Sequence, residues 1–148
     1  MELTNEQISE FQRTFPIVIP DPSKLVETML LELFKTHREY LSLFKKLSDV
    51  SYEKLATSPE FQLHAELVGS ALRAVVDLLD KPDELKSVLF KLGAKHKKYG
   101  VTPEHIQNLG DILIGLVTDA IGEGQPQLLS LYKTTLAMVL NALSEACV

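Results

Sequence analysis

The sequence predicts an all-α protein, because its apolar residues recur at the spacing of helices. In successive segments they fall at i, i+3, i+4 and i+7, and strict alternation typical of strands is nearly absent. Clusters of proline and glycine separate these segments. At 148 residues, with 45% hydrophobic residues, the chain has the size of one ordinary domain. We therefore expect a single domain over residues 1–148.

The helices in the first half of the chain are predicted from start signals, breaks and apolar faces. Thr4-Asn5-Glu6-Gln7 has the form of a capping box, and Pro16 predicts that this first helix stops before residue 16. After a break at residues 20–23, a second helix is predicted by a shared apolar face. That face consists of Val26, Met29, Leu30, Leu33 and Phe34. A short helical or turn segment is expected at 40–47.

Four helices are predicted in the second half of the chain. Thr57-Ser58-Pro59-Glu60 is a start signal in which Glu60 is placed to reach back to the helix end. Lys81-Pro82-Asp83 separates that helix from the next, which is expected to end at Gly100. Further breaks and starts lie at 102–104 and 122–126, and the last helix is expected from about Leu128 to Ala146.

Two histidines lie in the apolar stripes of neighbouring predicted helices. His64 shares its helix face with Phe61, Val68, Ala71, Val75 and Leu78, whereas His96 shares its face with Leu85, Leu89 and Leu92. At roughly 100° per residue each histidine points where the apolar side chains point. We expect both imidazoles to face one interior.

A histidine on an apolar face has two interpretations. One such residue alone is more often a core histidine bonded to a carbonyl, but neutral imidazole is also the commonest ligand of transition metals. The chain lacks the closely spaced ligand cluster of a structural zinc site, and its only cysteine is Cys147. A haem would supply four nitrogens and leave two axial positions for histidine.

Three segments carry a resemblance to a known family. Residues 41–44, 58–65 and 92–101 resemble the globins in order, type and separation, and the resemblance extends over essentially the whole chain. The Gly100-Val101 pair after His96 and the separation 96 − 64 = 32 are similar to the neuroglobin branch. Residues 33–37 followed by Phe44 look like the helices that precede the haem in myoglobin.

The resemblance implies a globin fold of about eight helices, in a three-on-three sandwich around haem b. It implies that His96 is the proximal ligand of the iron and that His64 is the distal histidine. The second ring nitrogen of His96 should donate to a backbone carbonyl about one turn back. The other implied haem contacts are Leu30, Phe44, Val68, Leu92, Val101, Ile106 and Leu109.

The function implied by the resemblance is reversible binding of oxygen or another diatomic gas such as CO or NO, for storage, transport or sensing. His64 either donates a hydrogen bond to that gas or binds the iron itself, giving a hexacoordinate resting state. The apolar Leu67 favours the latter, since many oxygen-carrying globins place there a cation that tethers a haem propionate.

Other functions are kept open. One alternative is a redox or nitric oxide dioxygenase-type globin with an external reductase, and another is a haem-free helical interaction module. A peroxidase is disfavoured because no arginine accompanies His64. We therefore favour a protein that is not an enzyme, with the dioxygenase-type globin as the alternative.

Composition bears on partners and location. The net charge of −5 and the pI near 5.4 argue against nucleic acid, because phosphate binding needs a basic surface. No apolar run approaches the roughly 20 residues of a membrane span. The acidic start of the chain is unlike a secretory signal, and a single cysteine forms no internal disulfide, so we expect a cytoplasmic protein. The oligomeric state stays open.

Overall fold

The computed structural model describes residues 3–148, and within them every regular element is a helix. The all-α prediction is therefore confirmed for this part of the chain. Six helices are α-helical and two are 3₁₀ segments. They are α1 (Asn5–Val18), α2 (Pro22–Thr36), η1 (Arg38–Leu43), η2 (Tyr52–Thr57), α3 (Pro59–Asp77), α4 (Pro82–Lys98), α5 (Pro103–Ile121) and α6 (Pro126–Glu145).

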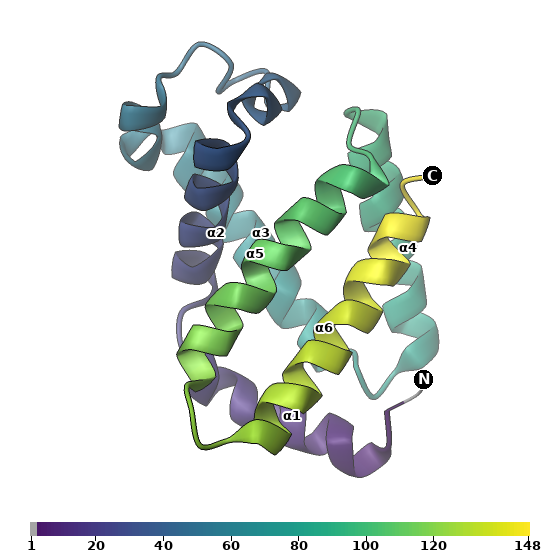
Figure 1. Cartoon of the computed structure of the whole chain (residues 1–148). Coiled ribbons are helices and arrows are strands. Elements are labelled where there is room, and N and C mark those ends of the chain that lie inside the picture. The colour runs from purple at the N-terminus through teal and green to yellow at the C-terminus, as the bar shows by residue number, and fades with distance from the viewer. Residues whose placement is uncertain (1–2) are drawn as a thin grey trace.

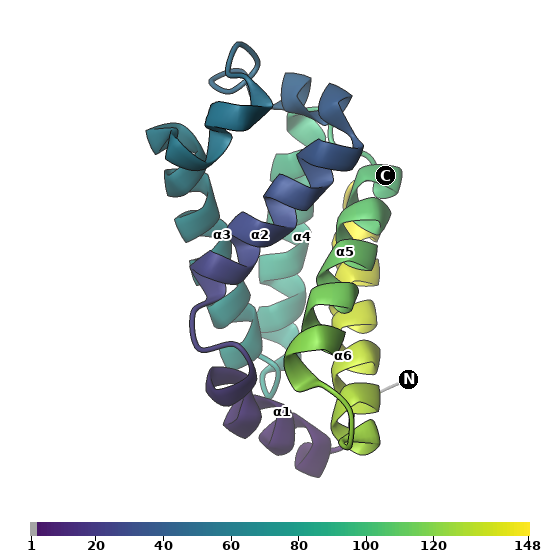
Figure 2. The ribbon, with the colours of Figure 1, turned by 60° about the vertical axis from the view of Figure 1, so that its left-hand side comes forward.

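The long helices cross one another around a shared apolar interior (Figure 1). Helix α2 packs on α3 and α5, α5 lies beside α6, and α4 packs on α6. Helix α1 lies across one end of the bundle, and η1 and η2 lie at the opposite end (Figure 2). The largest fully buried side chains come from separate helices and include Phe11, Phe34, Phe61 and Tyr132.

Several predicted helix ends are confirmed. The Thr4 hydroxyl accepts from the Gln7 N–H at 3.1 Å, and the Gln7 side chain accepts from the Thr4 N–H at 2.8 Å, which completes the capping box. Gly100 follows α4 with φ of 90°, a left-handed conformation that glycine adopts without steric cost. Gly122 ends α5 in the same region, with φ of 74°.

The prediction that the first helix stops before Pro16 is wrong, since α1 continues to Val18. Pro16 has no N–H to donate to the Gln12 carbonyl, so one helical bond is lost. The helix continues because Phe15 and Ile19 are buried, and because the Ile19 N–H closes the last turn onto the Phe15 carbonyl at 2.8 Å.

Two smaller expectations also need correction. Glu60 does not reach the backbone at the start of α3; the Ser58 hydroxyl donates to its carboxylate at 3.3 Å instead. The last helix runs over Pro126–Glu145 instead of from Leu128 to Ala146, because Pro126 is accommodated in its first turn.

The crossing of α2 and α3 is close, and it places the start of α2 against the middle of α3. A Cβ atom added to Gly69 would lie 2.8 Å from the backbone nitrogen of Ser23. Glycine is therefore needed at this contact.

Within residues 3–148, no helix is both long and apolar enough to cross a membrane.

Candidate functional site

His96 lies in the last turn of α4 and is fixed by its own helix. Its Nδ1 is 2.6 Å from the carbonyl oxygen of Leu92, one turn earlier. A carbonyl only accepts, so Nδ1 carries the proton and Nε2 keeps a free lone pair. The predicted bond to a carbonyl one turn back is confirmed, and it presents Nε2 as a ligand atom.

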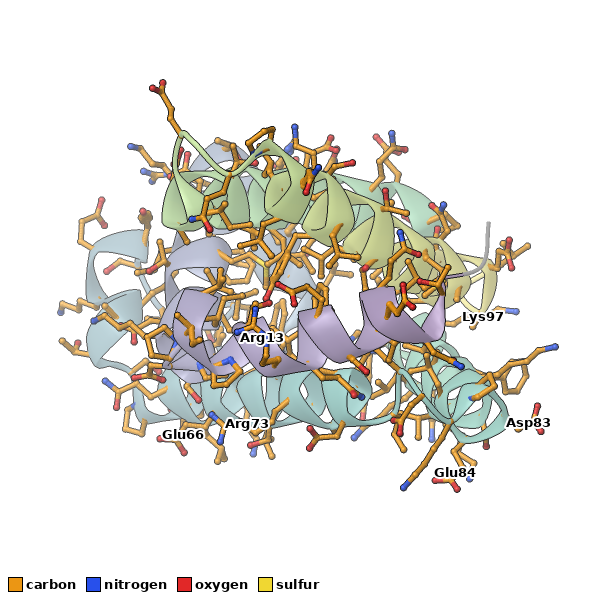
Figure 3. All side chains as sticks on the ribbon, turned by 90° about the horizontal axis from the view of Figure 1, so that it is seen from below. Arg13, Glu66, Arg73, Asp83, Glu84 and Lys97 are labelled. Carbon is orange, nitrogen blue, oxygen red and sulfur yellow. The ribbon has the colours of Figure 1, made fainter. Side chains whose placement is uncertain are left out.

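His64 lies on α3 and is half-buried, on the side away from the charged outer face of this helix. Glu66 and Arg73 are exposed on that outer face (Figure 3). The His64 ring meets the ring of Phe44 in an edge contact, with centroids 5.0 Å apart. Phe44 in turn meets Phe34 of α2 in the same way, at 5.3 Å. The His64 imidazole is therefore positioned by aromatic packing.

The environment of His64 favours its neutral form. Burial lowers the pKa of His64, and Coulombic interactions with His96 and Lys95 lower it further. A neutral imidazole can bind a metal, or it can accept a hydrogen bond at one ring nitrogen and donate one from the other.

The structure places the predicted contact residues on the elements around the two histidines. Leu30 of α2 and Ile106 of α5 are buried, with exposed fractions of 4% each. The remaining apolar ones are half-buried: Phe44, Val68, Leu92, Val101 and Leu109. Leu30 belongs to the main core, and Phe44, Val68 and Leu109 pack against it, whereas Leu92, Val101 and Ile106 lie outside that cluster.

These residues fit a haem. Two imidazoles come from facing helices, one of them with a fixed lone pair, and half-buried apolar side chains lie around them. Among residues 3–148, no group of three or more His, Cys, Asp or Glu is placed to hold a metal ion. A macrocycle that brings its own nitrogen ligands needs only the two axial histidines from the protein.

An aromatic cluster formed by Tyr40, His37 and His105 was not predicted from the sequence. The His37 and Tyr40 rings stack at 4.6 Å, and His105 meets Tyr40 edge-on at 4.5 Å. The Asn108 amide donates to the Tyr40 hydroxyl at 2.7 Å. His105 also accepts from the Thr102 N–H at 3.0 Å, as part of the cap of α5. Both additional histidines thus have structural roles.

Comparison with known proteins gives a family match and two informative sets of relatives. The sequence model described as Globin matches residues 27–143. Cytoglobin-1 of Oryzias latipes is 32% identical over 98 residues, 66% of this chain and 52% of that protein. Neuroglobin of Tetraodon nigroviridis is 32% identical over 92 residues, 62% of this chain and 58% of that protein. The chain thus spans little more than half the length of these curated relatives.

Solved structures similar to this one show its fold. A hexacoordinated heme protein from an anhydrobiotic tardigrade superposes with a TM-score of 0.85 at 18% identity, covering 98% of this chain and 95% of that chain. Drosophila melanogaster globin superposes with a TM-score of 0.84 at 17% identity, covering 97% and 94%. The predicted globin fold is confirmed by these similarities.

Proposed function

Because this chain belongs to the globin family, as the match over residues 27–143 shows, we propose that it binds haem between α3 and α4 and reversibly binds oxygen or another diatomic gas there. The observation that carries the proposal is the His96 ring, whose Nδ1 is held by the Leu92 carbonyl so that Nε2 is left for iron. The neutral His64 on the facing helix supports it.

The residues of this chain have separate roles in the proposal. Haem b, when bound, supplies the iron at which CO, NO or oxygen is held. His96 is the proximal ligand and His64 the distal residue. The apolar contacts exclude water from this region, and they are Leu30, Phe44, Val68, Leu92, Val101, Ile106 and Leu109.

We propose further that His64 binds the iron in the resting state. Its ring has an edge contact with Phe44, and burial lowers its pKa, which favours the neutral form that binds iron. Leu67 is apolar and 60% exposed, so no cation at this position tethers the distal helix to a propionate. A similar structure is that of a hexacoordinated heme protein. The alternative is an open site in which His64 only donates a hydrogen bond to the gas.

The proposal extends to organisation and location. Residues 1–148 form one globin domain that acts in the cytoplasm, without nucleic acid or membrane as partner. The acidic balance of −5 supports the absence of nucleic acid binding. Storage, transport and sensing of a gas would all use the same arrangement of residues. The alternative redox or nitric oxide dioxygenase role would require an external reductase.

The proximal assignment is tested with a set of matched histidine variants. His96→Ala should lose haem or hold it weakly, whereas His37→Ala and His105→Ala should keep a Soret band close to that of the wild type. The two controls remove an imidazole from the Tyr40 cluster and leave α4 unchanged. A fully haem-loaded His96→Ala protein with unchanged ligation would refute the assignment. A wild-type protein that is colourless after haem addition and removal of the unbound haem would favour a haem-free interaction module.

The distal assignment has its own measurement. Ferrous protein without gas should show two resolved visible bands, the mark of low-spin iron with two histidine ligands. His64→Leu should replace them by one broad band. If the wild type already shows the broad band and His64→Leu leaves it unchanged, His64 is not an iron ligand and serves as a hydrogen-bond donor.

A further inference from the structure

Helix α4 and the end of α6 meet in the closest helix contact made by a glycine of this chain. A Cβ atom added to Gly93 of α4 would lie 2.3 Å from the Cβ of Ala146 and 2.9 Å from the carbonyl oxygen of Leu143. Real Cβ atoms do not approach other atoms so closely, so no larger residue fits at position 93 without displacement of a helix. Gly93 is fully buried in this contact.

Two hydrogen bonds flank this contact and join the same two segments. The buried Cys147 thiol donates to the Gly93 carbonyl at 3.5 Å. Burial raises the pKa of the Cys147 thiol, so it stays protonated as a donor. The Lys97 ammonium, labelled in Figure 3, donates to the Val148 carbonyl at 2.7 Å. Residues 143–148 therefore contact α4 at two positions in its last turns, Gly93 and Lys97.

These two contacts lie next to the residues that orient the His96 imidazole. Gly93 follows Leu92, whose carbonyl fixes His96 Nδ1, and Lys97 follows His96 directly. Helix α4 packs mainly on α6 and has few contacts with α3. The position of α4 is therefore set from the side of α6, opposite the distal histidine.

The geometry points to Gly93, Ala146 and Cys147 as positioning residues for His96: their contact sets how closely the proximal imidazole approaches the haem iron. This inference rests on the proposed function. A Cβ at position 93 pushes α4 away from α6, and His96 moves with it because its ring is bonded to the backbone of the same helix. The substitution therefore changes the bond between His96 and the iron and leaves the residues that contact the gas unchanged.

The test compares alanine substitutions at three helical glycines in a His64→Leu background, where His96 is the one axial histidine. Gly93→Ala should shift the iron–histidine stretching band in resonance Raman spectra of ferrous protein. It should also speed haem transfer to excess apomyoglobin by about 10-fold or more, the usual size of such outer-shell effects. Gly115→Ala is the open control, because nothing lies within 4 Å of its added Cβ, and Gly69→Ala is the crowded control on α3.

A compensating substitution makes the test specific. Ala146→Gly removes the atom that lies 2.3 Å from the added Cβ, but the Leu143 carbonyl oxygen at 2.9 Å remains, so this substitution should return the band of Gly93→Ala part of the way to the parent position. An unchanged band in Gly93→Ala overturns the inference, as does a shift that Ala146→Gly does not reduce or that Gly69→Ala reproduces. If Gly93→Ala does not fold, Ala146→Ser and Cys147→Ala perturb the same contact and should shift the band to a smaller extent; no shift in either overturns the inference. A parent protein that binds no haem refutes the proposed function as well.

Discussion

The buried hydroxyl of Tyr132 allows a stability prediction that does not depend on haem. Tyr132 is completely buried on α6, and its ring stacks on Phe11 with centroids 4.2 Å apart. Its hydroxyl lies 2.7 Å from the Thr14 hydroxyl. The Thr14 hydroxyl also donates to the Glu10 carbonyl at 2.8 Å, so its single proton is used and Tyr132 is the donor between the two hydroxyls.

Tyr132→Phe removes this hydrogen bond and preserves the ring packing. The Thr14 hydroxyl keeps its acceptor, so no buried donor is left without a partner, and the expected loss is about 1 kcal/mol of unfolding free energy. For a chain of this size the loss corresponds to a decrease in Tm of roughly 3 °C. Urea titrations followed by far-ultraviolet circular dichroism at pH 7 measure it. Tyr99→Phe is the matched control, because Tyr99 is 58% exposed and should change stability by less than about 0.5 kcal/mol.

The same pair predicts a pH dependence with a defined sign. Burial raises the pKa of Tyr132 above that of the unfolded chain. The stabilisation by the neutral hydroxyl is complete below the unfolded value of about 10 and is lost as the pH rises above it. The stability difference between wild type and Tyr132→Phe should therefore narrow above pH 10. A difference that is constant from about pH 7 to 11, or an equal loss in Tyr99→Phe, would refute the reasoning.

Three further substitutions have expected outcomes in thermal unfolding of the same preparations. Gly69→Ala should destabilise by about 1–3 kcal/mol, because its Cβ meets the backbone of Ser23 at 2.8 Å and backbone cannot rotate away. Gly115→Ala should stabilise by up to about 1 kcal/mol, since alanine favours a helix and the space is open. Asn108→Ala should cost about 1 kcal/mol, because the Tyr40 hydroxyl loses its donor; an unchanged Tm would show that water replaces the amide.

Helix starts were predictable because capping is local. The hydroxyls of Thr4 and Thr102 each bond a backbone N–H three residues later, and both partners lie within a short stretch of sequence. The end of α1 was not predictable in this way. Whether a helix passes Pro16 depends on how much apolar surface Phe15 and Ile19 bury against distant helices, which the local sequence does not record.

In the candidate site, the features that depend on local sequence could be predicted. Helical periodicity places His64 and His96 on inward faces, and a helix always offers a carbonyl one turn before a histidine. The edge contact of Tyr40 with His105 joins distant segments, and no spacing rule encodes it. Pairwise contacts of this kind require the fold.

Gly93 lies between these two cases. A single glycine inside a helical pattern lowers helix stability, and a close approach by another part of the chain is one reason for it. The sequence alone does not separate Gly93, which has such a contact, from Gly115, which has none. Ala146 and Cys147 contact Gly93 because the end of α6 packs against α4, and this packing is a property of the fold.

The two histidines are held in different ways, and this difference bears on the proposed gas binding. His96 is fixed by a short hydrogen bond within its own helix, and two further hydrogen bonds join that helix to residues 147 and 148. Within residues 3–148 the side chain of His64 makes no hydrogen bond to protein, and its orientation rests on the ring of Phe44. Packing contacts resist rotation of a ring less than a charge-assisted or short hydrogen bond does. In the proposed function, a fixed His96 and a less restrained His64 would let His64 leave the iron when a gas enters while haem stays bound.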